Sequence, residues 1–210
     1  MNQAVYFHRL GTSQDEDSLV IAHPESPEWG YSAAVTDDGE HLVITVWQGT
    51  DNRYQIMHQD LTDPDAAPRF LIEGFDHDYT LVGNVGDELF FRTNKDAPRN
   101  RLIALDVDNP EPENWREIIA QEEDVLDGVS LVGGRIIADY MQDAQTVVKV
   151  FDPDGNQTGT VNLPGIGTAY GFNGKFDDPE TFFSYTSYDT PTTVNRLDVS
   201  TGEVTVFRKP

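Results

Sequence analysis

Histidine is the side chain that most often binds metals or transfers protons in proteins, and this chain has five of them. They are His8, His23, His41, His58 and His77. None stands at a metal-ligand spacing from another histidine or from an acid, and His58 lies within a predicted strand. A structural role is the favoured interpretation for each. We therefore predict no metal site and no cofactor.

Other nucleophile and cofactor signatures are equally scarce. The chain has no cysteine, which excludes disulfides, thiolate catalysis and cysteine-based zinc sites. No serine sits in a Gly-x-Ser-x-Gly elbow. The glycine-containing segment from Gly165 to Gly171 is one residue too long for a dinucleotide-binding loop, and it precedes a strand instead of a helix. No catalytic residue is predicted in this chain.

One acidic segment begins like a calcium-binding loop. Asp152, Asp154 and Asn156 have the correct spacing, but Gln157 occupies the position that requires glycine, and no helices flank the segment. We interpret it as a hairpin turn.

Its first aspartate is one of four that recur at a constant step of 46 residues: Asp60, Asp106, Asp152 and Asp198. A metal-binding role is one interpretation of this repeat. The favoured one is structural, because aspartate accepts backbone N–H bonds at turns and helps to end a strand.

The repeat extends to the strands that position these acids. Residues 41–61 predict two strands, Leu42–Trp47 and Tyr54–Asp60, joined by a Gly-Thr-Asp-Asn turn. The first of them recurs at steps of 47, 47 and 46 residues, at Leu42, Leu89, Ile136 and Phe182. A period of about 40–50 residues built from strands alone is typical of a β-propeller with four-stranded blades. The predicted fold class is therefore all-β.

Strand counting divides the chain into an outer half-blade and four complete blades. The half-blade covers residues 4–23, with strands Ala4–Leu10 and Ser18–His23. The blades cover about residues 30–72, 79–120, 128–163 and 169–207 of a single propeller segment, 1–210. No helix is predicted, and Gln121–Leu126 could form a short turn at most. The count indicates a piece of a larger ring.

The repeat also predicts which strands are equivalent and which residues are buried. The second strands are expected near Leu42–Val46, Leu89–Arg92, Ile136–Tyr140 and Phe182–Tyr185. The residues expected in the core are Val43, Ile103, Ile137, Val148 and Phe183.

The net charge of −23 limits the partners. Such a surface repels phosphate backbones and anionic membranes, so neither nucleic acid nor membrane is an expected partner. Attraction of cationic substrates is one interpretation of the charge, and solubility is the favoured one. No signal peptide or membrane span is recognised, and the compartment stays open between cytoplasm and periplasm.

Several peculiar strings resemble the propeller of bacterial prolyl oligopeptidases (prolyl endopeptidases). They are LGTSQDEDSLV, PEWG, VTDDGEHLVITVWQGTDN, GDELFFRTNKDAPRNRLIALD, WREII and DDPETFFSYTSYDTPTTVNRLDV. The resemblance implies part of an unclosed seven-bladed propeller that caps an α/β-hydrolase domain with a Ser-Asp-His triad. It also implies that the propeller restricts entry to short, proline-containing peptides, which the hydrolase cleaves after proline.

The triad-bearing segment is absent from these residues, so this chain alone is expected to be inactive. The implied partners are the hydrolase domain of the same parent protein and short peptides. Two alternatives stay open, a free-standing interaction module and an excised fragment.

The resemblance also implies a substrate-binding role for Gly30, Trp47 and Thr50, where the mammalian type has Met, Arg and Cys. Trp47 could stack on an apolar or proline side chain, or it could belong to the core of its blade. The two interpretations carry equal weight.

The half-blade raises one further expectation. Its strand Ala4–Leu10 has no predicted neighbour on its inner side, and an open strand edge tends to recruit a partner. We therefore expect either self-association through open blade edges or a closure that rearranges strands between the termini.

Overall fold

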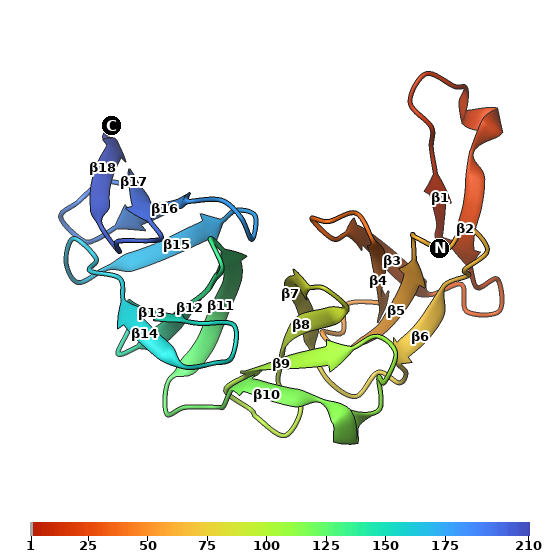
Figure 1. Cartoon of the computed structure of the whole chain (residues 1–210), viewed down its shortest axis with the longest axis horizontal. Helices are drawn as coiled ribbons and strands as arrows, with labels where there is room; N and C mark the ends of the chain where they lie inside the picture. The colour runs from red at the N-terminus through yellow and green to blue at the C-terminus, as the bar shows by residue number, and fades with distance from the viewer. Residues whose placement is uncertain (1) are drawn as a thin grey trace. The chain divides into compact units, whose positions relative to one another are not determined.

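The computed structural model describes residues 2–210, which form one two-stranded and four four-stranded antiparallel sheets (Figure 1). In each sheet the strand order follows the chain order. The two-stranded sheet consists of β1 (Ala4–Phe7) and β2 (Ser18–Ala22). The next two sheets consist of β3 (Trp29–Val35), β4 (His41–Gln48), β5 (Tyr54–Asp60) and β6 (Arg69–Ile72), and of β7 (Tyr79–Val85), β8 (Glu88–Thr93), β9 (Arg101–Asp106) and β10 (Arg116–Ile119).

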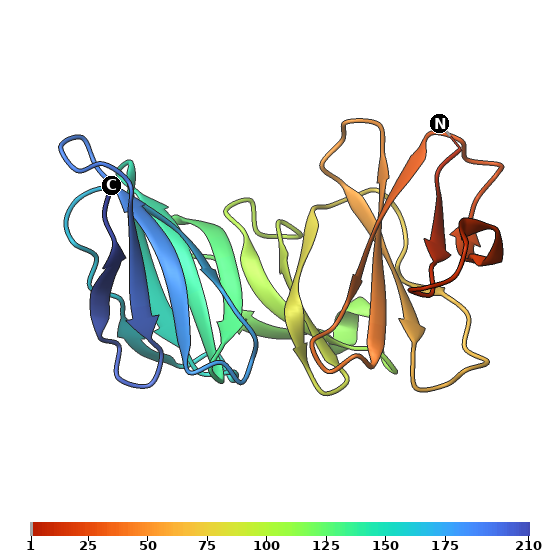
Figure 2. The ribbon, with the colours of Figure 1, turned by 90° about the horizontal axis from the view of Figure 1, so that it is seen from above.

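The last two sheets complete the chain. They consist of β11 (Val125–Val132), β12 (Arg135–Gln142), β13 (Gln145–Phe151) and β14 (Gln157–Thr160), and of β15 (Thr168–Asn173), β16 (Glu180–Thr186), β17 (Thr193–Asp198) and β18 (Val204–Arg208). The only helical segments in residues 2–210 are two single 3-10 turns, Gln14–Glu16 and Pro112–Asn114. Figure 2 shows the first turn in the red loop between β1 and β2. Neither turn approaches the length needed to span a membrane.

The chain divides into two compact units. The first contains the described residues up to Tyr79, together with Gly86–Glu88 and Leu105–Trp115. The second contains Thr80–Val85, Leu89–Ala104 and Arg116–Pro210.

The predicted second strands all lie within strands of the structure, in β4, β8, β12 and β16. All five predicted core residues are buried. Both predictions are confirmed. The 46-residue step therefore corresponds to one four-stranded sheet.

Three of the four second strands, β4, β8 and β12, are buried on both faces because they are apolar at successive positions. The fourth, β16, is buried mainly on one face, and its Phe182 is exposed. In β12, Ile136, Ala138 and Tyr140 belong to one hydrophobic cluster with residues of β8 to β11. Ile137, which points the other way, belongs to a second cluster with residues of β15 to β17. Successive side chains of a strand alternate between faces, so the absence of apolar–polar alternation reflects cover on both sides.

The hairpin from β3 to β5 shows how the local sequence fixes the register. Gly39 closes the turn after β3 by donating its N–H to the Thr36 carbonyl at 2.9 Å, with φ at +79°. This φ favours glycine. In β4 and β5, His41 pairs with Asp60 and Val43 pairs with His58. The side chains of all four residues therefore lie on the same face of the sheet.

The four recurring aspartates accept backbone N–H bonds just after their strands end. The donors are Thr62 at 2.7 Å from Asp60, Asp108 at 2.8 Å from Asp106, Asn156 at 2.8 Å from Asp152 and Ser200 at 3.0 Å from Asp198. The structural interpretation of the repeat is thereby confirmed. Each carboxylate terminates its strand by supplying an acceptor that the chain would otherwise lack.

Several strand boundaries differ from the prediction, and the end of β1 and the start of β11 have a clear cause. β1 ends at Phe7 instead of Leu10, because Thr12 bonds to the Arg9 carbonyl through both its N–H and its hydroxyl and so turns the chain. β11 begins at Val125, where only a turn was expected, because the Leu126 N–H bonds to the Arg99 carbonyl and the Leu126 side chain is buried.

Replacing Asp198 should separate the role of its charge from that of its hydrogen bonds. Bonds from the Ser200 hydroxyl and the Thr201 N–H lower the Asp198 pKa to about 2. The stability from this charge is therefore present above the unfolded pKa of about 4 and is lost as the pH falls through about 2. Asp198→Asn keeps an acceptor oxygen without the charge, so its thermal midpoint should fall less than that of wild type between pH 4 and pH 2.

The matched variant Asp198→Ala removes the acceptor as well. It should lower the thermal midpoint at neutral pH, where Asp198→Asn stays closer to wild type. Equal midpoints for the two variants at neutral pH would contradict the role assigned to the turn. Differential scanning calorimetry across this pH range gives both comparisons.

Candidate functional site

Two of the residues expected to bind substrate, Gly30 and Trp47, face one another across β3 and β4. They are paired in the register of these strands. Gly30 is buried, Trp47 is half-buried, and Thr50 lies exposed in the loop after β4. The structure therefore brings Gly30 and Trp47 together and leaves Thr50 a short distance along the chain.

The indole of Trp47 lies directly over the backbone of Gly30. A Cβ atom built on Gly30 would lie 2.3 Å from an indole carbon of Trp47, closer than any real contact. Gly30 therefore leaves free the space that the indole occupies, because any other residue would place its Cβ atom there. Trp47 as a whole is half-buried.

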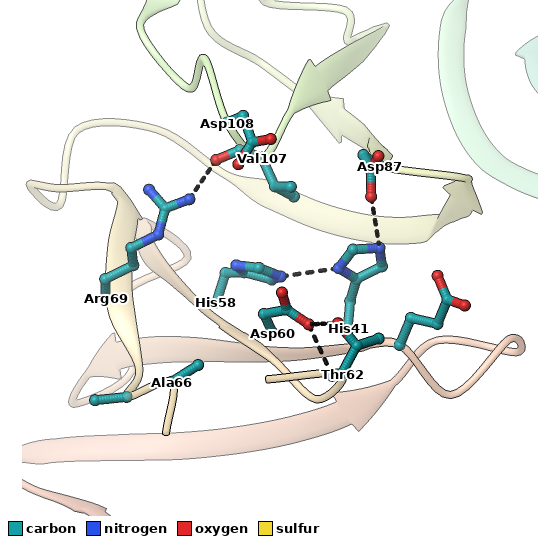
Figure 3. A pocket seen from close by; sticks show the side chains of 11 residues that line it. His41, His58, Asp60, Thr62, Ala66, Arg69, Asp87, Val107 and Asp108 are labelled. Carbon is teal, nitrogen blue, oxygen red and sulfur yellow. Dashed lines mark hydrogen bonds and ion pairs between the residues drawn. The ribbon is translucent and has the colours of Figure 1, made fainter. Parts of the chain in front are cut away.

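A second candidate site is a polar pocket of about 420 Å³ in the first unit (Figure 3). The start of β4 and the end of β5 provide His41, His58 and Asp60. Arg69 comes from β6, and Asp87 and Asp108 come from the two loops that flank β8 and β9.

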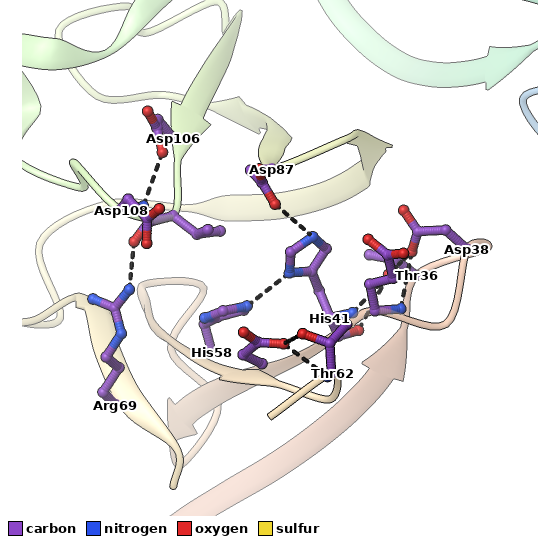
Figure 4. Close-up of polar contacts among 12 residues, drawn as sticks. Thr36, Asp38, His41, His58, Thr62, Arg69, Asp87, Asp106 and Asp108 are labelled. Carbon is purple, nitrogen blue, oxygen red and sulfur yellow. Dashed lines mark hydrogen bonds and ion pairs between the residues drawn. The ribbon is translucent and has the colours of Figure 1, made fainter. Parts of the chain in front are cut away.

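Two buried histidines form the floor of this pocket. His41 Nδ1 lies 2.9 Å from His58 Nε2, and the two residues are 3% and 2% exposed. Figure 4 shows this contact and the second one of His41, in which Nε2 faces Asp87 Oδ1 at 3.8 Å. Burial, followed by the nearby charge of His41, lowers the pKa of His58 to about 4. His58 is therefore neutral at pH 7.

The walls of the pocket are mainly acidic. Asp60 is held by the N–H and the hydroxyl of Thr62, and the bond from the Thr62 hydroxyl is the main reason that the Asp60 pKa is lowered. Arg69 is directed away from the histidines because its guanidinium donates to the Val107 carbonyl. The pocket thus presents carboxylates around two buried imidazole rings.

This pair of histidines was missed by sequence reasoning. His41 and His58 are 17 residues apart, a spacing that matches no metal-binding motif. The available signal was the hairpin register: if His41 opposes Asp60, then His58 lies diagonally opposite His41 on the same face. The structural role expected for both histidines stays a prediction, and their contact with each other was not predicted.

A third feature is a half-buried carboxylate in the second unit. Asp139 of β12 is paired with Gly128 of β11, and a Cβ atom on Gly128 would lie 2.5 Å from Asp139 Oδ1. Burial, aided by the charge of Asp127, raises the pKa of Asp139 to about 6. The carboxylate occupies the space above a glycine, as the Trp47 ring does in the first unit.

The sheets described above are those of a β-propeller, and comparison with known sequences identifies the family. A sequence profile of the prolyl oligopeptidase N-terminal β-propeller domain matches residues 1–210. The chain belongs to this family. The resemblance noted in the sequence and the predicted fold class are both confirmed.

Known relatives include proteins named prolyl endopeptidase. The chain is 37% identical over 207 residues to the prolyl endopeptidase of Elizabethkingia meningoseptica. The aligned region covers 98% of this chain and 29% of that protein. It spans less than a third of the curated relatives it matches.

Solved structures give the same result. A structure reported in a study of two prolyl endopeptidases has a TM-score of 0.91 at 36% identity, over 97% of this chain and 30% of that one. Prolyl oligopeptidase B from Galerina marginata has a TM-score of 0.89 at 24% identity, over 99% of this chain and 30% of that one. The second likeness supports the fold alone.

Substituting Gly30 should reveal its contact with Trp47. Gly30→Ala forces the indole to move, and we expect a loss of about 1–3 kcal/mol in the free energy of unfolding. In a Trp47→Ala background the same change should cost much less, because no ring remains to be displaced. Urea denaturation of the four proteins measures this coupling. Additive losses would contradict the contact.

Asp139 should make stability fall between pH 4 and pH 7. Because its pKa is raised in the folded state, the protonated Asp139 carboxyl contributes fully to the free energy of unfolding below about pH 4. This contribution is lost as the pH rises through about 6. Asp139→Asn lacks this loss, so at pH 7.5 it should be more stable than wild type by about 1–3 kcal/mol. Urea denaturation at pH 4 and pH 7.5 tests this. A variant with the pH dependence of wild type would refute it.

Proposed function

We propose that residues 1–210 form one propeller segment of a prolyl oligopeptidase-like serine endopeptidase, in which the propeller admits and binds short proline-containing peptides. The peptides are cleaved after proline by an α/β-hydrolase domain of the same parent protein. The observation that carries this proposal is the family match over the whole chain, together with relatives named prolyl endopeptidase. The 210 residues supply no Ser-Asp-His triad of their own.

The proposed contact with the peptide is the exposed part of Trp47, which is half-buried. The indole lies against Gly30, the residue paired with Trp47 across the two strands. A ring held in this way offers a flat apolar surface at little entropic cost, and it suits a proline or another apolar side chain. Thr50, exposed in the following loop, would provide a polar contact beside it.

The self-association expected from open edges stays a prediction. Within residues 2–210, the two-stranded sheet pairs β1 only with β2. Tyr6 and Phe7 of β1 are exposed there. These apolar side chains support a partner at this edge, which in the proposed enzyme would belong to the same protein.

A chimera can test the function without assuming the extent of the parent protein. The matching segment of the Elizabethkingia meningoseptica prolyl endopeptidase is replaced by this chain, and hydrolysis of a chromogenic Gly-Pro peptide is measured. We expect the chimera to cleave the peptide, whereas the isolated chain does not. A folded chimera without activity, or an isolated chain whose turnover is blocked by an active-site serine reagent, would contradict the proposal.

Within the chimera, Trp47→Ala should raise KM by about 3- to 10-fold with little change in kcat, which corresponds to the loss of one aromatic contact. The matched variant Trp47→Phe keeps an aromatic face and should retain most of the affinity. An unchanged KM for Trp47→Ala would assign the ring to packing against Gly30 alone.

A further inference from the structure

The turn between β3 and β4 carries a cluster of metal-binding side chains beside the histidine pair. One donor atom from each of Asp38, Glu40 and His41 lies within 4.8 Å of the other two. Asp87, in the turn before β8, adds a fourth donor at 3.8 Å from His41 Nε2. All four residues belong to the first unit.

An exposed group of acids is common without any ligand, but His41 is a separate observation. Its side chain is almost completely buried, and its Nδ1 is occupied by His58. Its Nε2 is buried and makes no hydrogen bond. The 3.8 Å to Asp87 exceeds hydrogen-bond length. A buried nitrogen without a partner, pointed at a carboxylate, indicates that a cation belongs between them.

The contact with His58 prepares His41 for this role. When His41 Nδ1–H donates to His58 Nε2, the proton is on Nδ1 and the lone pair of Nε2 is directed at Asp87. A lone pair that faces a carboxylate is unfavourable unless a positive charge separates them. Histidines that bind metals generally donate their other N–H to a fixed acceptor in this way.

The turn also fixes one of the carboxylates. Asp38 Oδ1 accepts a bond from the Thr36 hydroxyl at 2.6 Å and another from the Glu40 N–H at 3.1 Å (Figure 4). The His41 N–H in turn donates to the same hydroxyl of Thr36 at 3.1 Å. Asp38 and His41 are therefore held by a common partner, while Glu40 and Asp87 remain exposed and can move.

We propose that His41 Nε2 and the carboxylates of Asp38, Glu40 and Asp87 bind one divalent cation of the borderline class represented by Zn²⁺. One imidazole nitrogen with carboxylate oxygens suits such an ion better than Ca²⁺ or Mg²⁺, which prefer oxygen alone. Metal–ligand distances near 2 Å require the donors to approach one another by about 1 Å. The exposed Glu40 and Asp87 side chains allow this approach.

A cation bound here would join two turns that are distant in the sequence. The turn before β4 and the turn before β8 would share one ion, in place of the mutual repulsion of their carboxylates. Binding to the folded chain alone stabilises it by mass action, so the thermal midpoint should rise with the concentration of Zn²⁺.

Calorimetric titration of the 210-residue chain with Zn²⁺ tests the site. We expect one ion per chain and an affinity at least about tenfold weaker in Glu40→Gln and in Asp87→Asn. Asp37→Asn is the matched control, because it removes one negative charge from the same turn without removing a proposed ligand. It should stay within about twofold of wild type, since a single exposed charge contributes little.

A second control addresses the exposed pair in which His8 Nδ1 lies 2.6 Å from Asp17. His8→Gln should leave Zn²⁺ binding unchanged, and the ¹⁵N signal of His41 Nε2 should shift on saturation. Absence of saturable binding would overturn the proposal. So would loss of binding in His8→Gln, or equal weakening by Asp37→Asn and Glu40→Gln, which would indicate diffuse attraction to the acidic surface.

Discussion

Burial of the second strands β4, β8 and β12 on both faces is the constraint on which the rest of this structure depends. A strand such as β12, with Ile136 in one hydrophobic cluster and Ile137 in another, cannot lie at a solvent boundary without large cost. Most of the polar groups described here therefore lie at turns and strand ends, where backbone groups need partners, and Asp139 within β12 is accommodated by the space above Gly128. The strand-ending aspartates and the His41–His58 pair both lie in such places.

Most of the fold could be predicted because the same physical requirement recurs with a constant period. Apolar runs predicted the positions of the second strands, and turn residues such as Asp37 to Gly39 predicted the hairpins. Two predicted boundaries were wrong for different reasons. β11 is extended by the bond from Leu126 to Arg99, a partner that is distant in the sequence and not visible in a local pattern. β1 is shortened by a local turn, in which Thr12 bonds to the Arg9 carbonyl.

The sites were less predictable for a related reason. Gly30, Trp47 and Thr50 were identified as candidates through family resemblance, but the contact between the Trp47 ring and Gly30 was not predicted. The proximity of His41 and His58 depends on strand register, and a shift of one residue would place the two rings on opposite faces. Pocket walls drawn from loops 40 or more residues apart, such as Asp87 beside His41, follow only from the folded chain.

The equal spacing of the strand-ending aspartates has a consequence for how such chains change during evolution. Genetic exchange between the codons of Asp106 and Asp152 removes 46 residues and leaves one aspartate at the same turn. The resulting sheet keeps β7 to β9 and takes β14 as its last strand. Its third and fourth strands are still joined by a turn that begins with an aspartate. Sheets can thus be gained or lost as whole units, and ring size becomes a heritable trait that varies in steps.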